Sequence, residues 1–347
     1  DIFVYDTRKD SDGGAWRHRT QNTSWYNEGV SATRGARKEF PAVAVIVVES
    51  AGAYQNMITI YDGDDPNLPM WMVFQNREAA GGADQTTNVS YYAAGPYYTT
   101  KVAMLNGIMV DCQFRSAGHI ADIVKGVTRY NFINDSSTMM TDEGDFRRNG
   151  NLGDERNTER SYTRISGKEI VNTQCKDVAM TVLPNAPIDA STGLPVPTIA
   201  VGTDGGVSII KDNGDVSDIT NTNSGYNYVT QVKIDQKYVY IGFGASNLYI
   251  AGIGYAVPIP SRDVSLGAIT GATTAADFRW SNNSTSGSGT YSDYYVNPSD
   301  SSGDDVNGTV LTKRGMSFGT ESGLSILLNE ERDTNGSIAH ITKDYNT

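Results

Sequence analysis

The segment Pro197–Thr220 (PTIAVGTDGGVSIIKDNGDVSDIT) constrains the fold more than any other part of the chain. Ile199–Val201 is apolar at consecutive positions, and Val207–Ile210 is apolar except for Ser208, so both faces of each expected strand carry apolar residues. Strands of this kind belong to sheets that are covered on both sides. Asp204–Gly206 and Lys211–Asp215 are rich in Gly, Asp and Asn, which favour tight turns. We therefore expect a short antiparallel sheet of three strands, packed between other sheets like a blade of a β-propeller.

The same unit recurs along the chain. Phe318–Leu327 (FGTESGLSIL) matches Val201–Ile210 (VGTDGGVSII) position by position in character, and Phe243–Ile250 is a looser copy. Repetition of one supersecondary unit is the sequence signature of a repeat architecture. We therefore predict an all-β fold, a β-propeller of roughly six or seven blades built from short antiparallel sheets, with long polar loop insertions.

The 347 residues are expected to form a single propeller-like domain, 1–347, which is a segment of a longer chain. The mixed-charge stretch 134–174 is interpreted as a surface insertion, and the stretch 281–308 as a Ser/Gly/Asn-rich loop. A propeller closes by pairing strands from its two ends, because open edge strands invite aggregation. Ile2–Tyr5 is the expected closing partner of the last blade, and a second early strand is expected to run through Trp16.

Charge and composition exclude several classes of partner. The net charge is −12, which argues against binding of a nucleic-acid backbone. No run approaches the roughly 18–20 apolar residues of a membrane span, so no membrane insertion is expected. Cys112 and Cys175 are in no CxxC pattern, and two buried thiols are expected, although a disulfide between them stays open.

Tyr91, Tyr92, Tyr97 and Tyr98 are the best candidates for a binding site. They lie in one Gly- and Asn-rich excursion, where tyrosines offer rigid, amphipathic contact area. Such a loop could bind a glycan, another subunit or a neighbouring chain. The alternative is that these tyrosines pack within an edge strand.

Metal binding and catalysis have weaker signals. Asp62, Asp64 and Asp65 could supply oxygen ligands to Ca²⁺, as could Asp212 and Asp215, because Ca²⁺ takes six to eight oxygens. The alternative is that these residues only make turns. No other cofactor is expected. No pair of carboxylates is marked for glycosidase chemistry, and no catalytic residue is predicted.

Several strings are similar to a known family. They are Asp6–Arg17 (DTRKDSDGGAWR), Thr23–Glu28 (TSWYNE), Phe40–Val47 (FPAVAVIV), Tyr61–Pro66 (YDGDDP) and, most specifically, Asp177–Gly206. Together they resemble the large virion structural proteins of marine tailed bacteriophages.

The resemblance implies a structural protein of the virion, associated with the tail or its fibres. Its loops would bind a host-surface glycan or receptor, or other virion proteins, and the chain would form a homo-oligomer in the particle. Two alternatives remain: an architectural tail-tube or nozzle subunit, and a glycan-cleaving, sialidase-like propeller of a tail spike. The resemblance supplies no catalytic residues.

Overall fold

The computed structural model confirms an all-β fold, with short helices only. None of the helices in the described part of the chain is long and apolar enough to cross a membrane. The residues that the structure describes are 1–50, 56–75, 97–115, 126–155, 162–221, 227–243, 253–266, 278–281, 293–295, 306–312, 315–320, 323–328 and 340–341.

The first sheet is a meander of four antiparallel strands. They are β1 (Ile2–Asp6), β2 (Val43–Ser50), β3 (Asn56–Asp62) and β4 (Met70–Gln75), in that order. Ile2–Tyr5 pairs with β2 and not with the last sheet, so the expectation that it closes a ring was wrong. The partner is set by the apolar run of β2, which begins 37 residues after β1 ends at Asp6.

The segment between β1 and β2 is helical where a strand through Trp16 was expected. It forms two 3-10 helices, Thr7–Lys9 and Ala15–Arg19, followed by α1 (Ser24–Asn27). Gly14 has φ 82°, a left-handed conformation that starts the second of these turns. The turn carries the indole of Trp16 into the core, where the side chain is fully buried.

The second sheet has six strands in the order β10-β9-β8-β7-β6-β5. Residues 134–174, expected as a surface insertion, contribute three of these strands and the helix α2, and Met139 and Met140 are buried there. The elements are β5 (Tyr97–Leu105), β6 (Ile108–Arg115), β7 (Val127–Asn131), β8 (Ser136–Met140), β9 (Asp145–Arg148), α2 (Leu152–Glu155) and β10 (Tyr162–Ser166).

The third sheet contains the segment Pro197–Thr220. It consists of β11 (Cys175–Thr181), β12 (Thr198–Thr203), β13 (Gly206–Ile210), β14 (Val216–Thr220) and β18 (Val264–Ser265), the last pairing in parallel. The three strands predicted within Pro197–Thr220 are confirmed, with register Thr203↔Gly206 at the first turn. The copy at Phe318–Leu327 is confirmed as well, because Thr320↔Gly323 closes the corresponding hairpin of the fifth sheet. Of the looser copy, residues 244–250 lie outside the described residues.

The fourth and fifth sheets complete the described strands. The fourth is β15 (Val229–Ile234), β16 (Tyr238–Phe243), β17 (Ile253–Pro258), β19 (Phe278–Ser281) and β20 (Asp293–Tyr295). The fifth is β21 (Val306–Thr312), β22 (Gly315–Thr320), β23 (Gly323–Leu328) and β24 (His340–Ile341). Most of the expected loop 281–308 lies outside the described residues.

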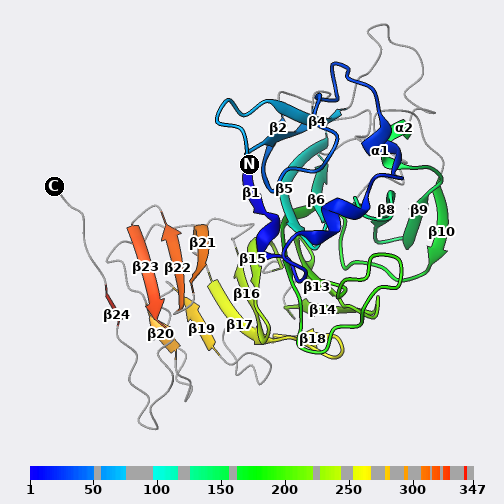
Figure 1. Ribbon diagram of the computed structural model, residues 1–347. Helices are drawn as coiled ribbons and strands as arrows, with labels where there is room; N and C mark the ends of the chain where they lie inside the picture. The colour runs from blue at the N-terminus through cyan, green and yellow to red at the C-terminus, as the bar shows by residue number, and fades with distance from the viewer. Residues whose placement is uncertain are drawn as a thin grey trace, which may run out of the picture.

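The five sheets follow one another in sequence order. The first strand of each sheet lies beside the first strand of the next: β1 contacts β5, β5 contacts β11, β11 contacts β15 and β15 contacts β21. Figure 1 shows the sheets placed one after another, from the blue β1–β4 to the orange and red β21–β24, with the first and last sheets apart. None of the sheets formed by the described residues is closed, and a propeller of six or seven blades is not confirmed.

Three apolar layers hold consecutive sheets together. Tyr5 and Ile46 of the first sheet share a buried cluster with Met104 of the second. Val110 of the second sheet shares another cluster with Val201 of the third. A third cluster joins the third and fourth sheets, and its members include Ala200, Ile209, Val232, Ile241 and Tyr255. Neighbouring residues of β12 therefore enter different layers, which explains why Ile199–Val201 is apolar at consecutive positions.

The tight hairpin of the third sheet gives a first test. Gly206 has φ +127°, and a Cβ there would lie 2.5 Å from the carbonyl oxygen of Ile219. We expect Gly206→Ala to lower the free energy of unfolding by about 1 kcal/mol or more, measured by urea denaturation. Gly29→Ala is the control, because nothing lies within 4 Å of a Cβ at Gly29. Equal stability of the two variants would contradict the assigned strain.

Candidate functional site

An aromatic cluster in the first layer fixes the backbone around the candidate site. Phe40 is fully buried, and its ring centroid lies 4.8 Å from that of Trp71 and 5.2 Å from those of Trp16 and Phe132. Edge-to-face and tilted contacts at these distances stabilise the cluster beyond simple burial. The residues just before Phe40 and just after Trp16 are consequently held at the surface in fixed positions.

A buried polar network ties the same region to the second sheet. The carboxylate of Asp10 accepts hydrogen bonds from the Tyr5 hydroxyl, from Trp16 Nε1 at 2.8 Å and from the Asn106 backbone N–H at 2.9 Å. The Gly107 N–H donates to the Tyr5 hydroxyl at 3.0 Å. Burial raises the pKa of Asp10, and the donors of Tyr5 and Trp16 offset only part of that rise.

Arg34 arranges the loop that leads into Phe40. Arg34 is 1% exposed, and its guanidinium carbon lies 4.7 Å from the centre of the Trp71 ring. The guanidinium donates hydrogen bonds to the carbonyl oxygens of Arg37 at 2.7 Å and Lys38 at 2.9 Å. A planar guanidinium can hold several carbonyl groups at fixed angles. This buried group therefore sets the direction in which the Arg37 side chain leaves the loop.

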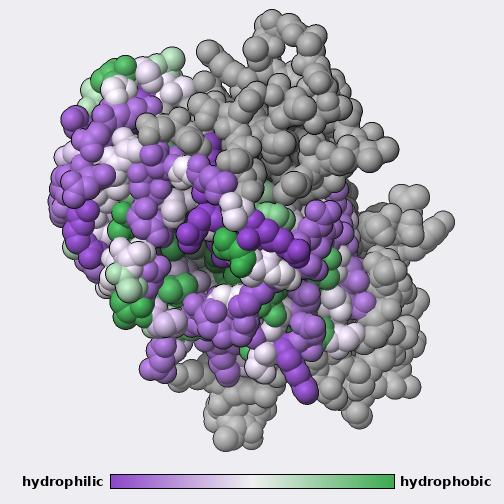
Figure 2. All heavy atoms as spheres, turned by 90° about the vertical axis from the view of Figure 1, so that its right-hand side faces the viewer, coloured by the Kyte–Doolittle hydropathy of each residue, from purple (hydrophilic) through white to green (hydrophobic). Residues whose placement is uncertain are grey.

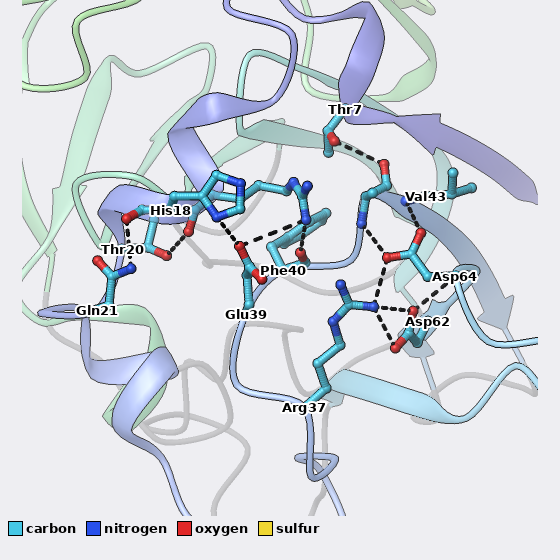
Figure 3. A network of polar contacts seen from close by, with 12 residues as sticks. Thr7, His18, Thr20, Gln21, Arg37, Glu39, Phe40, Val43, Asp62 and Asp64 are labelled. Atoms are coloured by element: carbon cyan, nitrogen blue, oxygen red, sulfur yellow. Dashed lines mark hydrogen bonds and ion pairs between the residues drawn. The ribbon is translucent and has the colours of Figure 1, made fainter.

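Six charged or titratable side chains meet above this scaffold, and we call them the charged surface (Figure 3). They come from the second 3-10 helix, the loop before β2 and the end of β3 with its turn. The members are Arg17, His18, Arg37, Glu39, Asp62 and Asp64.

Arg37 neutralises the two aspartates of the charged surface. Its Nη1 lies 2.7 and 2.9 Å from the carboxylate oxygens of Asp62 and 2.7 Å from Oδ2 of Asp64. Partial burial would raise the pKa of Asp64, but the N–H groups of Ala42 and Val43, together with Arg37, hold that pKa below its ordinary range. This half of the surface is an ordered ion-pair cluster that fixes the start of β2 against the end of β3.

The other half leaves an imidazole accessible. His18 Nδ1 lies 2.6 Å from Glu39 Oε1, and the His18 side chain is 66% exposed. Arg17 Nη1 donates to the Phe40 carbonyl at 3.0 Å and lies 4.0 Å from the same Glu39 oxygen. An exposed imidazole beside a carboxylate can donate and accept hydrogen bonds with a polar ligand such as a sugar hydroxyl.

The predicted tyrosine site is only partly visible. Tyr91 and Tyr92 lie outside the described residues. Tyr97 and Tyr98 begin β5, opposite Arg115 and Phe114, so their backbone agrees with the strand alternative. The proposal that the four tyrosines bind a ligand stays a prediction.

The candidate calcium ligands have other partners. Asp62 and Asp64 contact Arg37, and Asp65 Oδ1 accepts from the backbone and side chain of Asn67 at 2.8 and 3.0 Å. At the second candidate turn, Asp215 is paired with Lys168. Across the part of the chain that the structure describes, no group of three or more His, Cys, Asp or Glu is placed to hold a metal ion.

Both cysteines are buried thiols, and no disulfide joins them. Cys112 of β6 and Cys175 of β11 belong to the apolar layer between the second and third sheets. The expectation of two buried thiols is confirmed.

Sequence reasoning missed four members of the charged surface. Arg17, His18, Arg37 and Glu39 carried no motif, and their partners lie up to 27 residues away, as in Arg37 and Asp64. The available signal was a cluster of charges directly before the apolar run that begins at Phe40. It indicated a strand entrance but not which charges would pair.

The chain was compared with protein-family models, curated proteins and solved structures. No protein-family model and no curated protein matches it. Among solved structures, the extracellular domain of a one-component system of B. thetaiotaomicron matches with a TM-score of 0.33 and 12% identity, over 86% of this chain and 35% of that one. The extracellular domain of a hybrid two-component system of the same organism matches with a TM-score of 0.33 and 11% identity. That match covers 86% of this chain and 34% of the other. A likeness at this TM-score supports no inference about fold or function.

The raised pKa of Asp10 predicts a pH effect on stability. The folded chain holds this proton more tightly than the unfolded chain, so the contribution of Asp10 is present at low pH and is lost as pH rises through the raised pKa. Asp10→Asn should destabilise the fold by about 1–3 kcal/mol at low pH, because an amide cannot accept all three hydrogen bonds. The stability difference between wild type and variant should shrink as pH rises above about 4.

Asp215→Asn is a control with the opposite sign. Lys168 lowers the pKa of Asp215, so the advantage of the wild type over this variant should be lost as pH falls. Denaturant unfolding of the full chain across a pH series measures both differences. Parallel pH profiles for the two variants would contradict the assignment.

Proposed function

We propose that the chain is a structural protein of a tailed-bacteriophage virion, associated with the tail or tail fibre, that presents loops for binding a host surface or neighbouring subunits. The observation that carries this proposal is the succession of apolar layers between consecutive sheets. Such stacking makes a rigid scaffold, and binding residues are disproportionately found on loops that a rigid scaffold positions. The resemblance of Asp177–Gly206 and the other strings to phage virion proteins supplies the assignment to a particle.

In this proposal the sheets are blades of a β-propeller with six or seven blades. The first strands β1, β5, β11, β15 and β21 are neighbours in sequence order, as inner strands of successive blades would be. Further sheets would then be needed to complete the ring.

The surface chemistry is compatible with a particle in water that recognises polar ligands. Figure 2 shows a largely hydrophilic described surface on the side of the molecule that carries β8–β10, with some hydrophobic residues around a central hollow. The net charge of −12 favours solubility. Sites that are individually weak gain strength when many copies act on one particle.

An architectural tail-tube or nozzle subunit is the second candidate. It is favoured by the exposure of Ile2 and Val4 on β1, at 69% and 61%, because exposed apolar groups on a sheet mark contacts with other proteins. Location in the particle separates the two candidates: antibodies against the chain should label fibre tips for a receptor-binding protein and the tail tube for an architectural one.

The tyrosine loop gives the decisive test of receptor binding. Tyr91→Ser combined with Tyr92→Ser should weaken binding of the labelled chain to host cells by about tenfold or more, because truncating an interface hot spot costs about 2 kcal/mol. The measurement is cell binding, with competition against phage adsorption and an assay for released sugar.

Ile188→Ser is the control, because Ile188 is an exposed apolar residue on a different loop, at 62%. Unchanged adsorption by the double variant would remove these tyrosines from the site. Release of sugar from host envelopes would instead favour the glycan-cleaving alternative.

A further inference from the structure

The hairpin between β15 and β16 carries two tyrosine rings on the same side of the fourth sheet, and we call them the tyrosine pair. Tyr238 and Tyr240 are half-buried and alternate with Val239, which is buried in the layer shared with the third sheet. Their ring centroids lie 6.1 Å apart, and the ring planes are tilted by 57°. Pro258, opposite Tyr238 in the neighbouring strand, is exposed. The two rings therefore form an angled pair at an exposed end of the sheet.

One carboxylate holds the tyrosine pair in place. Asp235 Oδ1 accepts hydrogen bonds from the backbone N–H groups of Lys237 and Tyr238, each at 2.7 Å. Asp235 Oδ2 accepts a hydrogen bond from the Tyr240 hydroxyl at 2.9 Å. The same side chain thus fixes the turn and orients one ring. Rings held in this way lose little freedom when a ligand binds, which favours affinity.

The electrostatics of the tyrosine pair favour a positive ligand. Burial, followed by the hydrogen bond to Asp235 and the negative charge of that residue, raises the pKa of Tyr240. The Tyr240 hydroxyl therefore keeps its proton at neutral pH and continues to donate to Asp235. The faces of aromatic rings are also electron-rich and attract cations. A carboxylate beside two such rings, in a chain of net charge −12, makes a site of negative potential.

A cation of the chain itself already lies on one of the rings. The ammonium nitrogen of Lys237 is 4.7 Å from the centroid of the Tyr238 ring, within the range of a cation–π contact. Lys237 is exposed. Among the described residues, no cation lies over the ring of Tyr240, and Lys233 stands opposite Tyr240 in the strand register. The Tyr238 side of the pair is therefore the side that a cation from solution can reach.

We propose that the tyrosine pair binds a small organic cation of the quaternary ammonium type, which displaces the Lys237 ammonium from the Tyr238 ring. A quaternary ammonium group donates no hydrogen bonds and is weakly hydrated, so it leaves water for an aromatic face more readily than a lysine ammonium does. Lys237 acts as an internal competitor that keeps the affinity low. The inference does not depend on the proposed function, because it concerns a different site and a different class of ligand.

Saturation-transfer NMR of the full chain, with tetramethylammonium chloride as the probe, tests the proposal. Sodium chloride keeps the total salt concentration constant during the titration, so that general screening does not change. The wild type should show weak, saturable binding. Lys237→Ser removes the competitor and should strengthen binding by about two- to fivefold, the strength of an exposed cation–π contact.

Three further variants separate the rings from general electrostatics. Lys168→Ser is the matched control, because it also removes an exposed lysine near a carboxylate, that of Asp215 at 2.8 Å, and should bind like the wild type. Tyr238→Leu should abolish saturable binding. Tyr240→Phe keeps its ring and should bind at least as well as the wild type. Melting temperatures show which variants are folded.

Four outcomes would overturn the proposal. They are absence of saturable binding by both the wild type and Lys237→Ser, equal affinity of these two proteins, an equal gain in Lys168→Ser, and retained binding by folded Tyr238→Leu. Lys237→Ser alters only an exposed side chain, so it tests the proposal even where Tyr238→Leu does not fold.

A second set of probes identifies the source of the cation. Binding of free choline without co-sedimentation with phosphatidylcholine vesicles assigns the site to a soluble organic cation. Co-sedimentation that is lost in Tyr238→Leu assigns it to a lipid head group. Either result supports the site, and neither bears on receptor binding through Tyr91 and Tyr92, which is measured separately on host cells.

Discussion

Packing of sheets on both of their faces is the constraint on which the rest of this structure depends. In β12, Ile199 and Val201 enter the layer shared with the second sheet, while Ala200 enters the layer shared with the fourth. Each strand residue in the middle of the row therefore has an apolar neighbour sheet to contact, whichever side it points to. A polar residue at such a position loses water on either side, and it is tolerated only with a hydrogen-bond partner, as Ser208 has in Asp218.

Two of the buried carboxylates lie where one sheet meets the next. The Asp10 carboxylate binds Asn106 of the hairpin between β5 and β6, linking the first and second sheets. Asp177 of β11 accepts a hydrogen bond at 2.9 Å from the N–H of Val232 in β15, linking the third and fourth. Burial raises the pKa of both carboxyls. Apolar layers supply most of the stabilisation, and these directional contacts fix how the layers are aligned.

The sequence predicts those features that depend on local pattern. The three strands of Pro197–Thr220 and the matching hairpin of the fifth sheet follow from apolar runs separated by Gly- and Asp-rich turns. The strands within 134–174 were missed because their polar residues conceal a few buried ones such as Met139. At the charged surface, Asp62 and Asp64 were predicted as oxygen ligands for Ca²⁺. Their pairing with Arg37 depends on tertiary contacts that no local pattern encodes.

The same constraint decides where recognition can take place. Because strands in the middle of the row use both faces for packing, groups that contact a ligand must lie at strand ends, in loops, or on a sheet at the end of the row. The charged surface obeys this rule, since Asp62 ends β3, Glu39 lies in the loop before β2, and His18 lies in a helical turn. Under the proposed function, a polar ligand would therefore contact groups outside the packed faces of the sheets, and those groups could change without altering the stacked sheets.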